Sequence, residues 1–392
     1  MKMQFADRMT DYEEGIFQVL NEKKNEMLKR GRTVYNLSVG TPDFKPSKHI
    51  VDALVEAAKK PENFKYSLGD MPELLDAVVQ RFEKRYGVSG LKHEEITSVY
   101  GSQEGIAHIA MSICNPGDVV LVPNPGYPIF AIGPSLAGAE IVTYPLTEEN
   151  GFLPKLDEIP EDICKRAKMM IVSYPLNPVC AIAPRSFYEE LVEWALKNEI
   201  IIIHDNAYSD IVYDGNEGIS FLSIPGAKEV GAEFYSLSKS FDLTGARIAF
   251  LVGNEKLVQN FKKFRSQIDY GIFTPIQYAA IAALTGPDDD VIRQCEEYQK
   301  RRDALCGGMR KIGWNVPDSK GSMFAWGPVP DQYQSSTDFV MDLMEKTGVI
   351  CTPGSSFGSL GDRYVRFALT LPVSEIEKAV EAVRKSGIFE MP

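Results

Sequence analysis

Long apolar runs, cysteine pairs and an excess of positive charge are all missing from this sequence. No uninterrupted apolar stretch approaches the roughly 18 to 20 residues that cross a bilayer. Residues 1–15 are too polar for the apolar core of a signal peptide. We therefore expect a protein that is neither secreted nor embedded in a membrane, and we predict a cytoplasmic location.

Cysteine and histidine are scarce and scattered. The six cysteines form no C-x-x-C pair and lack the tight spacing of a disulfide framework, so reduced thiols are expected. The four histidines are not spaced as metal ligands, and metal catalysis is not expected. The 42 Lys and Arg against 54 Asp and Glu give a net charge of −12 without a basic block. This balance argues against the concentrated positive surface that binds nucleic acid.

The length and the apolar pattern predict an α/β protein with more than one domain. The 392 residues exceed the roughly 250–300 at which a single hydrophobic core stops growing. From about residue 50 to 285, helical stripes alternate with short apolar runs, which is typical of a mainly parallel sheet covered by helices on both faces. The clearest strands are apolar at every position, as burial on both faces requires: Val119–Val122, Met169–Val172, Ile200–Ile203 and Ala249–Val252.

Three segments depart from this pattern. Residues 12–30 predict a charged helix, residues 289–312 a long helix, and residues 315–392 a mixture of strands and helices. The first and the last fit a smaller α+β domain. We predict an N-terminal arm with part of the small domain over 1–48, a large domain over 49–287, and a long linking helix with a small C-terminal domain over 288–392.

Unusual residues follow four of the predicted strands, where open parallel sheets carry their functional groups. Asp205 comes directly after an apolar strand, where it is either a helix N-cap or a carboxylate that needs a cation. Lys239 is flanked by serines, and Arg247 follows eight residues later. A solvated turn would explain this segment, but a desolvated lysine can also form an imine with an aldehyde.

Two further strand ends add donors. Gly101 and Ser102 open directly into a helix, which makes either an ordinary cap or a phosphate site at free backbone N–H groups. Asn177 lies between two prolines that fix its backbone, although a simple turn would look the same.

Taken together, these motifs resemble the class I/II aminotransferases of the aspartate aminotransferase fold. The matching segments are Gly101-Ser102-Gln103, Asn177-Pro178, Asp205 with Tyr208, Ser236-Leu237-Ser238-Lys239 with Arg247, Ser38 to Phe44, Tyr66 to Leu74, Pro125 to Pro128, and Val365 to Phe367. The resemblance covers essentially the whole chain. It implies a mainly parallel seven-stranded sheet between helices (fold type I), a smaller α+β domain, pyridoxal 5′-phosphate bound to the large domain, and a homodimer. Gly101 to His108 is similar to the branch that includes LL-diaminopimelate and aspartate aminotransferases.

The resemblance also implies roles for single residues. Lys239 would hold the cofactor as a Schiff base and then move the proton at the substrate Cα. Asp205 would pair with the pyridine nitrogen, Tyr208 and Asn177 would donate to the phenolate oxygen, and Tyr127 would stack on the ring. The phosphate would be held by Ser102, Gln103, Ser236, Ser238 and Arg247, with Tyr66 from the neighbouring subunit. Arg366 would bind the substrate carboxylate bidentately beside the Gly40 backbone, with Asn177 also near the substrate.

Departures from the family pattern and rival activities leave part of the function open. Val179-Cys180 stands where the family has Thr-Gly, and Asp242 stands where it more often has Asn, Gly or a small residue. A carbon–sulfur β-lyase on the same fold begins with the same chemistry at Lys239. A non-catalytic ligand sensor is a remote alternative, and a dinucleotide dehydrogenase is weaker still because no Gly-x-Gly-x-x-Gly follows an early strand. The amino donor and acceptor, and any oligomer beyond a dimer, are not predicted.

Overall fold

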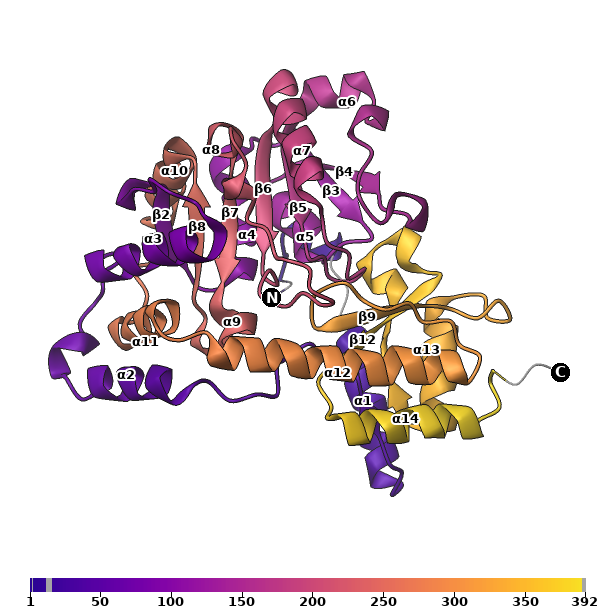
Figure 1. The fold of residues 1–392 in the computed structure, drawn as a ribbon. Coiled ribbons are helices and arrows are strands. Elements are labelled where there is room, and N and C mark those ends of the chain that lie inside the picture. The colour runs from indigo at the N-terminus through magenta and orange to yellow at the C-terminus, as the bar shows by residue number, and fades with distance from the viewer. Residues whose placement is uncertain (2, 12–15, 390–392) are drawn as a thin grey trace. The chain divides into compact units, whose positions relative to one another are not determined.

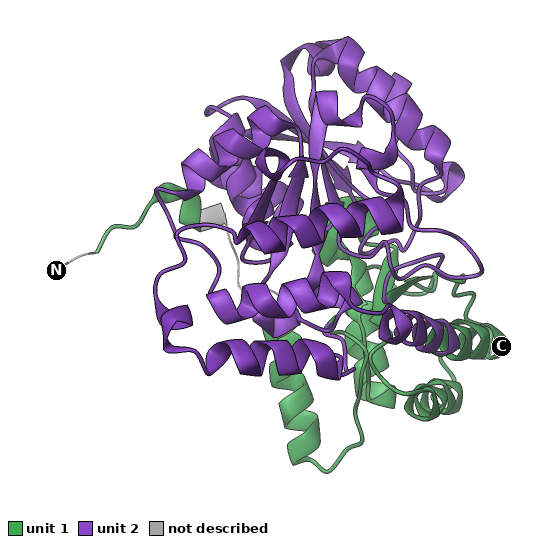
Figure 2. Ribbon diagram, turned by 60° about the vertical axis from the view of Figure 1, so that its left-hand side comes forward, with its two compact units in different colours: residues 1–40, 301–318, 324–392 green, residues 41–300, 319–323 purple. Residues whose placement is uncertain are grey.

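The computed structural model describes residues 1, 3–11 and 16–389 as two compact units (Figures 1 and 2). Unit 2 holds Thr41–Lys300 and Ser319–Met323, and unit 1 holds Met1–Gly40, Arg301–Asp318 and Phe324–Pro392. The long helix α12 (Asp289–Lys311) contributes residues to both units. The domain boundaries expected from the sequence, after residues 48 and 287, stay a prediction.

Unit 2 is built on a seven-stranded sheet with the order β2-β8-β7-β6-β5-β3-β4. Its strands are β2 (Ile96–Val99), β3 (Val119–Asn124), β4 (Glu140–Pro145), β5 (Ala167–Ser173), β6 (Ile201–Asn206), β7 (Gly231–Ser236) and β8 (Ala249–Gly253). Five strands, from β4 to β7, pair in parallel. Strand β8 runs antiparallel to both of its neighbours, so β2 points the same way as β7.

Helices cover both faces of this sheet (Figure 1). Side chains alternate between the faces of a strand, so Asp205 and His204 on β6 point in opposite directions. Asp205 accepts a hydrogen bond from Ser102 of α4, whereas His204 contacts Tyr188 of α7, which places these two helices on opposite faces. The helices of unit 2 are α2 (Lys48–Ala58), α3 (Pro72–Tyr86), α4 (Ser102–Ile113), α5 (Ile129–Leu136), α6 (Glu161–Arg166), α7 (Arg185–Asn198), α8 (Ala227–Val230), α9 (Leu237–Ser240), α10 (Glu255–Arg265), α11 (Thr274–Thr285) and the first half of α12.

Unit 1 contains a small antiparallel sheet with its own helices. The sheet order is β11-β12-β9, and a separate parallel pair joins β1 to β10. Its elements are α1 (Ile16–Lys29), β1 (Tyr35–Asn36), β9 (Phe324–Pro328), α13 (Ser336–Thr347), β10 (Val349–Ile350), β11 (Thr352–Pro353), β12 (Tyr364–Ala368) and α14 (Val373–Lys385). Trp314 packs against Phe339 and Phe367, which ties α13 to β12 through an aromatic core.

The predicted α/β class and the mainly parallel seven-stranded sheet are confirmed. The direction of one strand was not foreseen: Ala249–Val252 was expected to be parallel, but β8 is antiparallel. Its uniformly apolar sequence reflects burial on both faces, which does not depend on strand direction. The charged helix expected over residues 12–30 begins at Ile16 in the described chain, and residues 12–15 lie outside the described residues. No helix in the described residues is long and apolar enough to cross a membrane.

Candidate active site

The antiparallel strand β8 brings three distant parts of the chain together. Ala249, the first residue of β8, pairs with Val99 at the end of β2 and with Ser236 at the end of β7. Gly101 follows β2 by two residues, and Arg247 precedes β8 by two residues. The strand register therefore places the predicted phosphate ligands at one edge of the sheet.

The N-terminus of α4 and the Arg247 guanidinium form the tightest part of this edge. Gly101 has φ +89°, and a Cβ added there would lie 2.3 Å from Arg247 Nη2. Only glycine allows the guanidinium to lie so close to the start of the helix. Ser102 and Gln103 occupy the first turn, whose backbone N–H groups have no partner within the helix. A positive side chain beside free N–H groups is suited to a phosphate.

Two serines line the start of the short helix that carries Lys239. Ser236 Oγ accepts a hydrogen bond from Ser238 N at 3.2 Å and so caps α9. Both serines are buried. Because the Ser236 hydroxyl is the acceptor in this bond, its hydrogen can still be donated to a ligand.

Asp205 is the most unusual acid of the site. Its side chain is buried, it accepts a hydrogen bond from Ser102, and its Oδ1 has no hydrogen-bond partner among the described residues. Burial, with the negative charge of Glu233 behind it, raises the pKa of Asp205 to about 7, while the Ser102 hydrogen bond acts in the opposite direction. A carboxylate in this state favours a cationic or N–H donor at Oδ1.

The other predicted ring contacts follow neighbouring parallel strands. Ser173, at the end of β5, is in register with Asp205, so Asn177 and Tyr208 follow strand ends that share one edge. Both side chains are buried. Tyr127 lies in the loop after β3 and donates from its hydroxyl to Gln103 Oε1 at 2.9 Å. This bond joins two residues that the sequence assigned to the ring and to the phosphate.

Lys239 is half-buried on α9, and a carboxylate that departs from the family pattern lies near it. Gln294 on α12 donates to the Lys239 carbonyl and to Asp242 Oδ1, both at 3.0 Å. Burial and the charge of Asp43 raise the pKa of Asp242 to about 7, opposed by the Gln294 hydrogen bond and the charge of Lys239. Gln294 and Asp43 are residues that the sequence reasoning missed.

In unit 1, the predicted carboxylate ligands gather around one aromatic ring. The guanidinium carbon of Arg366 lies 4.2 Å from the centre of the Phe324 ring and 4.8 Å from that of Phe357. Arg366 Nη2 donates to the Ser38 carbonyl at 2.9 Å. A Cβ on Gly40 would lie 2.6 Å from the Phe324 ring, so glycine is needed at this position. Arg366 and Gly40 thus contact the same side chain within one unit.

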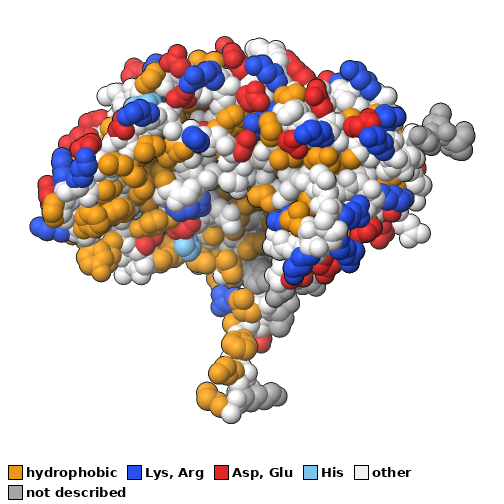
Figure 3. Space-filling view, turned by 90° about the horizontal axis from the view of Figure 1, so that it is seen from below, with side chains coloured by type: hydrophobic (Ala, Val, Ile, Leu, Met, Phe, Trp, Pro, Cys, Tyr) orange, Lys and Arg blue, Asp and Glu red, His pale blue; other side chains and the backbone are white. Residues whose placement is uncertain are grey.

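Tyr66 stands apart from the other predicted cofactor ligands. Its side chain is 82% exposed and contacts Tyr270, with 5.1 Å between the ring centres. Large exposed apolar side chains surround this pair in the chain: Phe64, Leu68, Ile268 and Phe273. Figure 3 shows hydrophobic side chains gathered on the side where α2 and α11 lie in Figure 1. We call the following six residues the exposed aromatic patch: Phe64, Tyr66, Leu68, Ile268, Tyr270 and Phe273.

Backbone geometry explains one departure from the family pattern. Cys180, where the family has glycine, has φ +62°, which is the left-handed region that glycine adopts readily. Its side chain is buried, with Sγ 3.1 Å from the Pro178 carbonyl oxygen. The altered sequence therefore keeps the turn after Asn177 at a cost of roughly 1 kcal/mol in backbone strain.

The donor set of the site fits pyridoxal phosphate. The buried Asp205 Oδ1, without a partner in residues 1, 3–11 and 16–389, suits a protonated ring nitrogen, and the Gly101–Arg247 contact suits a phosphate. Lys239 lies on a helix that begins at the same sheet edge. Among the described residues, no group of three or more His, Cys, Asp or Glu could hold a metal ion. The fold and the donor set define a pyridoxal phosphate enzyme of fold type I.

Comparison with known proteins specifies the family. Residues 32–383 match the family model for aminotransferase class I and II. An LL-diaminopimelate aminotransferase from Halothermothrix orenii is 42% identical over 98% of this chain and 99% of its own length, and one from Aquifex aeolicus is 40% identical over 97% and 98%. The structure of apo-BacF from Bacillus subtilis is similar with a TM-score of 0.95, 35% identity and full coverage of both chains. A probable N-succinyldiaminopimelate aminotransferase from Thermus thermophilus has a TM-score of 0.89 at 31% identity, covering 95% and 100%.

The chain belongs to the class I and II aminotransferases. It is a pyridoxal phosphate-dependent transaminase that acts on amino acids and 2-oxo acids, as the sequence motifs predicted. The relatives favour amino transfer over the β-lyase alternative.

Proposed function

We propose that LL-diaminopimelate is the amino donor of this enzyme. The support is the identity of 40–42% over nearly the whole chain with LL-diaminopimelate aminotransferases from several bacteria. We further propose that the residues at the sheet edge of unit 2 and around Phe324 of unit 1 carry the reaction. The observation on which the cofactor assignment rests is the buried Asp205 Oδ1, which no donor in the part of the chain that the structure describes satisfies.

The proposed mechanism divides the work between the cofactor and the side chains. When bound, pyridoxal phosphate supplies an aldehyde for imine formation and a ring that accepts electrons from the substrate Cα. Lys239 acts first as the amine that anchors the aldehyde. Once freed by the substrate amine, the Lys239 amine would act as the base that takes the proton from the substrate Cα, and it would hold that proton for return on the other side of the imine nitrogen.

The remaining site residues of unit 2 would orient the cofactor and stabilise the charges on its ring. Asp205 would hold the ring nitrogen through Oδ1, where its carboxylate would stabilise a positive charge. Tyr208 and Asn177 would donate hydrogen bonds to the ring oxygen, and Tyr127 would stack on the ring. The phosphate would be held at the start of α4 by donors from Ser102, Gln103, Ser236, Ser238 and Arg247.

Arg366 of unit 1 binds the substrate α-carboxylate in this proposal. Its planar guanidinium can form two parallel hydrogen bonds to a carboxylate, which a lysine cannot reproduce. The stacking on Phe324 and Phe357 and the bond to the Ser38 carbonyl hold the plane of the guanidinium in one orientation. The Gly40 backbone and Asn177 complete the carboxylate contacts.

We propose a homodimer in the cytoplasm as the working form. The exposed aromatic patch would be covered by the partner subunit, and Tyr66 would donate to the phosphate of the neighbouring site. Large contiguous apolar surfaces on soluble proteins mark interaction sites. The free cysteines agree with a reducing compartment.

A donor panel tests the substrate proposal. LL-diaminopimelate, aspartate, aromatic amino acids and lysine would each be added to the purified enzyme, first alone and then with a series of 2-oxo acids. We expect LL-diaminopimelate to bleach the lysine-linked absorbance and to show the highest kcat/KM. If another donor had a kcat/KM at least about tenfold higher, that donor would replace LL-diaminopimelate in this assignment, and the family would be unaffected. A tenfold ratio corresponds to about 1.4 kcal/mol in transition-state stabilisation.

The same preparations separate transfer from elimination. A β-lyase would release pyruvate and ammonia from a β-substituted amino acid with no acceptor present. We expect no such release, and we expect product formation to require a 2-oxo acid.

A further inference from the structure

A fully buried acid lies in the strand next to Asp205. Glu233 is in the middle of β7, between apolar residues, and has no exposed surface. It pairs in register with His204 of β6, which is also fully buried. Acids are almost never fully buried unless they are paired. None of the roles assigned above uses Glu233.

Four donors surround this carboxylate. Oε1 accepts from Asn206 Nδ2 at 3.0 Å and from Ser220 Oγ at 2.9 Å. Oε2 accepts from the Phe221 backbone N–H at 2.8 Å and contacts His204 Nδ1 at 2.8 Å. An acceptor-only carboxylate satisfies this set, whereas an amide side chain would direct one of its own donors at a neighbouring donor.

The hydrogen-bond network also assigns the state of His204. The Tyr188 hydroxyl lies 3.1 Å from His204 Nε2. A neutral imidazole that donates from Nδ1 to Glu233 can accept from Tyr188 at Nε2, so every polar atom of the ring has a partner. In this tautomer the Glu233 carboxylate carries the negative charge of the network.

The geometry of β6 connects this network to Asp205. His204 and Asn206 flank Asp205 in the strand, and their side chains lie on the face opposite to that of Asp205. Both side chains bind Glu233. The acid thus holds the backbone on each side of Asp205 from behind, while the Asp205 carboxylate points to the α4 face, where Ser102 binds it.

We propose that Glu233 is a positioning residue for the cofactor: it clamps β6 through His204 and Asn206 and thereby fixes the Asp205 carboxylate against the pyridine nitrogen. This inference rests on the proposed role of Asp205. The negative charge of Glu233 also lies close enough to disfavour a second negative charge at Asp205. A positive ring nitrogen beside Asp205 relieves that repulsion, so the two acids together favour the protonated ring.

The test compares two ligands in a set of variants. Apoenzyme is titrated with pyridoxal phosphate and with its carbocyclic analogue, in which a C–H group replaces the ring nitrogen. Both ligands offer the same aldehyde to Lys239 and the same phosphate to α4. Only the first can bond to Asp205 through the ring nitrogen. The readout is the dissociation constant, supported by the ¹⁵N NMR shift of the labelled ring nitrogen.

Glu233→Gln should weaken binding of pyridoxal phosphate by about tenfold, the effect of one buried donor left without an acceptor. Binding of the analogue should change by less than about twofold. The ring nitrogen signal should move toward the unprotonated position. Equal weakening of both ligands, or no change in either, would overturn the proposal, because a merely structural role does not distinguish the two ring atoms.

Two further variants keep the test valid if Glu233→Gln does not fold. Asn206→Leu leaves the charge of Glu233 but removes one of its two bonds to β6, and a smaller loss, selective for pyridoxal phosphate, is expected. Ser220→Ala is the matched control, because it removes one bond to Glu233 from outside β6 and should not distinguish the ligands. The same selective loss in Ser220→Ala would contradict a route through β6.

Wild type and Asp205→Ala separate this inference from the proposed function. The wild-type enzyme should prefer pyridoxal phosphate over the analogue, and Asp205→Ala should remove the preference. Wild type without such a preference would overturn the Asp205 assignment itself, and this proposal with it. A normal preference in wild type together with an unchanged preference in Glu233→Gln would overturn only the role of Glu233.

Discussion

Two buried acids five residues apart, Asp205 and Asp210, have opposite surroundings. Asp210 lies 2.9 Å from Arg85 Nε and 3.3 Å from Arg81 Nη2, and it also accepts a bond from the Tyr235 hydroxyl. Burial alone would raise the pKa of Asp210, but the charges of Arg81 and Arg85 lower it below the usual value. The pKa of Asp205 is raised to about 7, and one of its oxygens has no hydrogen-bond partner among the residues that the structure describes.

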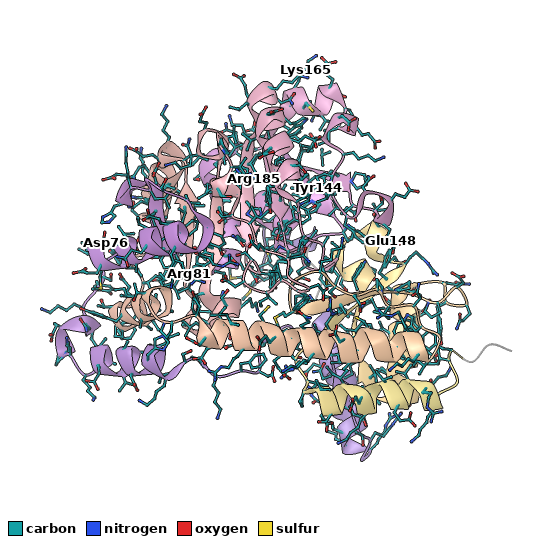
Figure 4. The ribbon with its side chains drawn as sticks, in the orientation of Figure 1. Asp76, Arg81, Tyr144, Glu148, Lys165 and Arg185 are labelled. Atoms are coloured by element: carbon teal, nitrogen blue, oxygen red, sulfur yellow. The ribbon has the colours of Figure 1, made fainter. Side chains whose placement is uncertain are left out.

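This difference in surroundings distinguishes an acid that stabilises the fold from an acid that is available to a ligand. Arg81 on α3 (Figure 4) also bonds to Asp288 and lies against the Phe241 ring, while Ser240 bonds to Asp210. This network, completed within the protein, fastens the loop after β6 to the helix that carries Lys239. A buried acid whose partners are all present stabilises the fold, whereas one with an unsatisfied oxygen is held ready for a ligand.

The largest effect is expected at Lys239, the proposed anchor of the cofactor whose ring nitrogen Asp205 would hold. Lys239→Ala should lower kcat by at least about 10⁴-fold, because it removes both the imine-forming amine and the general base. The lysine-linked absorbance should vanish, while thermal unfolding stays within a few degrees of wild type. A variant that kept this absorbance would show that another amine holds the cofactor.

Asp205→Asn should lower kcat by about 10² to 10⁴-fold and yet stabilise the apoenzyme. The folded-state pKa of Asp205, about 7, is above the ordinary aspartate value of 3.8. Ionisation therefore costs stability as the pH rises from about 4 to 7, by up to about 4 kcal/mol. Asparagine avoids this cost, so urea unfolding of the variant and wild type should agree near pH 4 and differ most at pH 8. A variant less stable than wild type at pH 8 would contradict the assignment.

Asp210→Asn should have the opposite effect on stability and lower the free energy of unfolding. At pH 8 we expect a loss of about 3 kcal/mol in unfolding free energy, because the buried Arg81 and the half-buried Arg85 lose a shared counter-charge, while Arg81 keeps another carboxylate, Asp288. The pKa of Asp210 is lowered, so its contribution is fully present above the unfolded pKa and disappears as the pH falls through the folded value. Unfolding curves across acidic pH measure this convergence. Parallel pH profiles for the Asp205 and Asp210 variants would remove the distinction between the two acids.

Gly101→Ala tests the phosphate side of the site. The new methyl group would meet Arg247 Nη2 at 2.3 Å in a backbone with φ +89°, so either the guanidinium or the start of α4 must move. We expect cofactor affinity to fall by about tenfold or more, since one charge-assisted contact is worth about 1.5 to 3 kcal/mol. Gly245→Ala in the same region, where a Cβ meets nothing within 4 Å, is the control and should bind normally. Similar losses in both variants would point to loop stability instead of the contact with Arg247.

The sequence predicted much of unit 2 because its signals are local. The apolar runs located β3, β5, β6 and β8, and the residues after the strands indicated the cofactor ligands. The direction of β8 and the contact between Gly101 and Arg247 depend on long-range pairing, which an apolar run does not encode. Glu233 left a readable signal, a single charge inside an apolar strand, but its four partners come from two other segments of the chain. The Gln294 contact with Lys239 likewise joins residues 55 positions apart.

The smallest effect is expected at Cys180, which, like Asp210, has a structural role. Its backbone is fixed by a bond from its N–H to the Leu176 carbonyl at 2.7 Å and by bonds from Lys320 and Gly321 to its own carbonyl at 3.3 Å. Because φ is +62°, Cys180→Gly relieves strain of roughly 1 kcal/mol, while the freer unfolded chain and the lost buried thiol offset about as much. Urea unfolding should therefore change by less than about 1 kcal/mol, with kcat within about twofold. Cys180→Ala loses the thiol but keeps the backbone strain, so it should be less stable than Cys180→Gly. The reverse order of stability would mean that side-chain packing, and not the left-handed backbone, decides which residue is tolerated near Asn177.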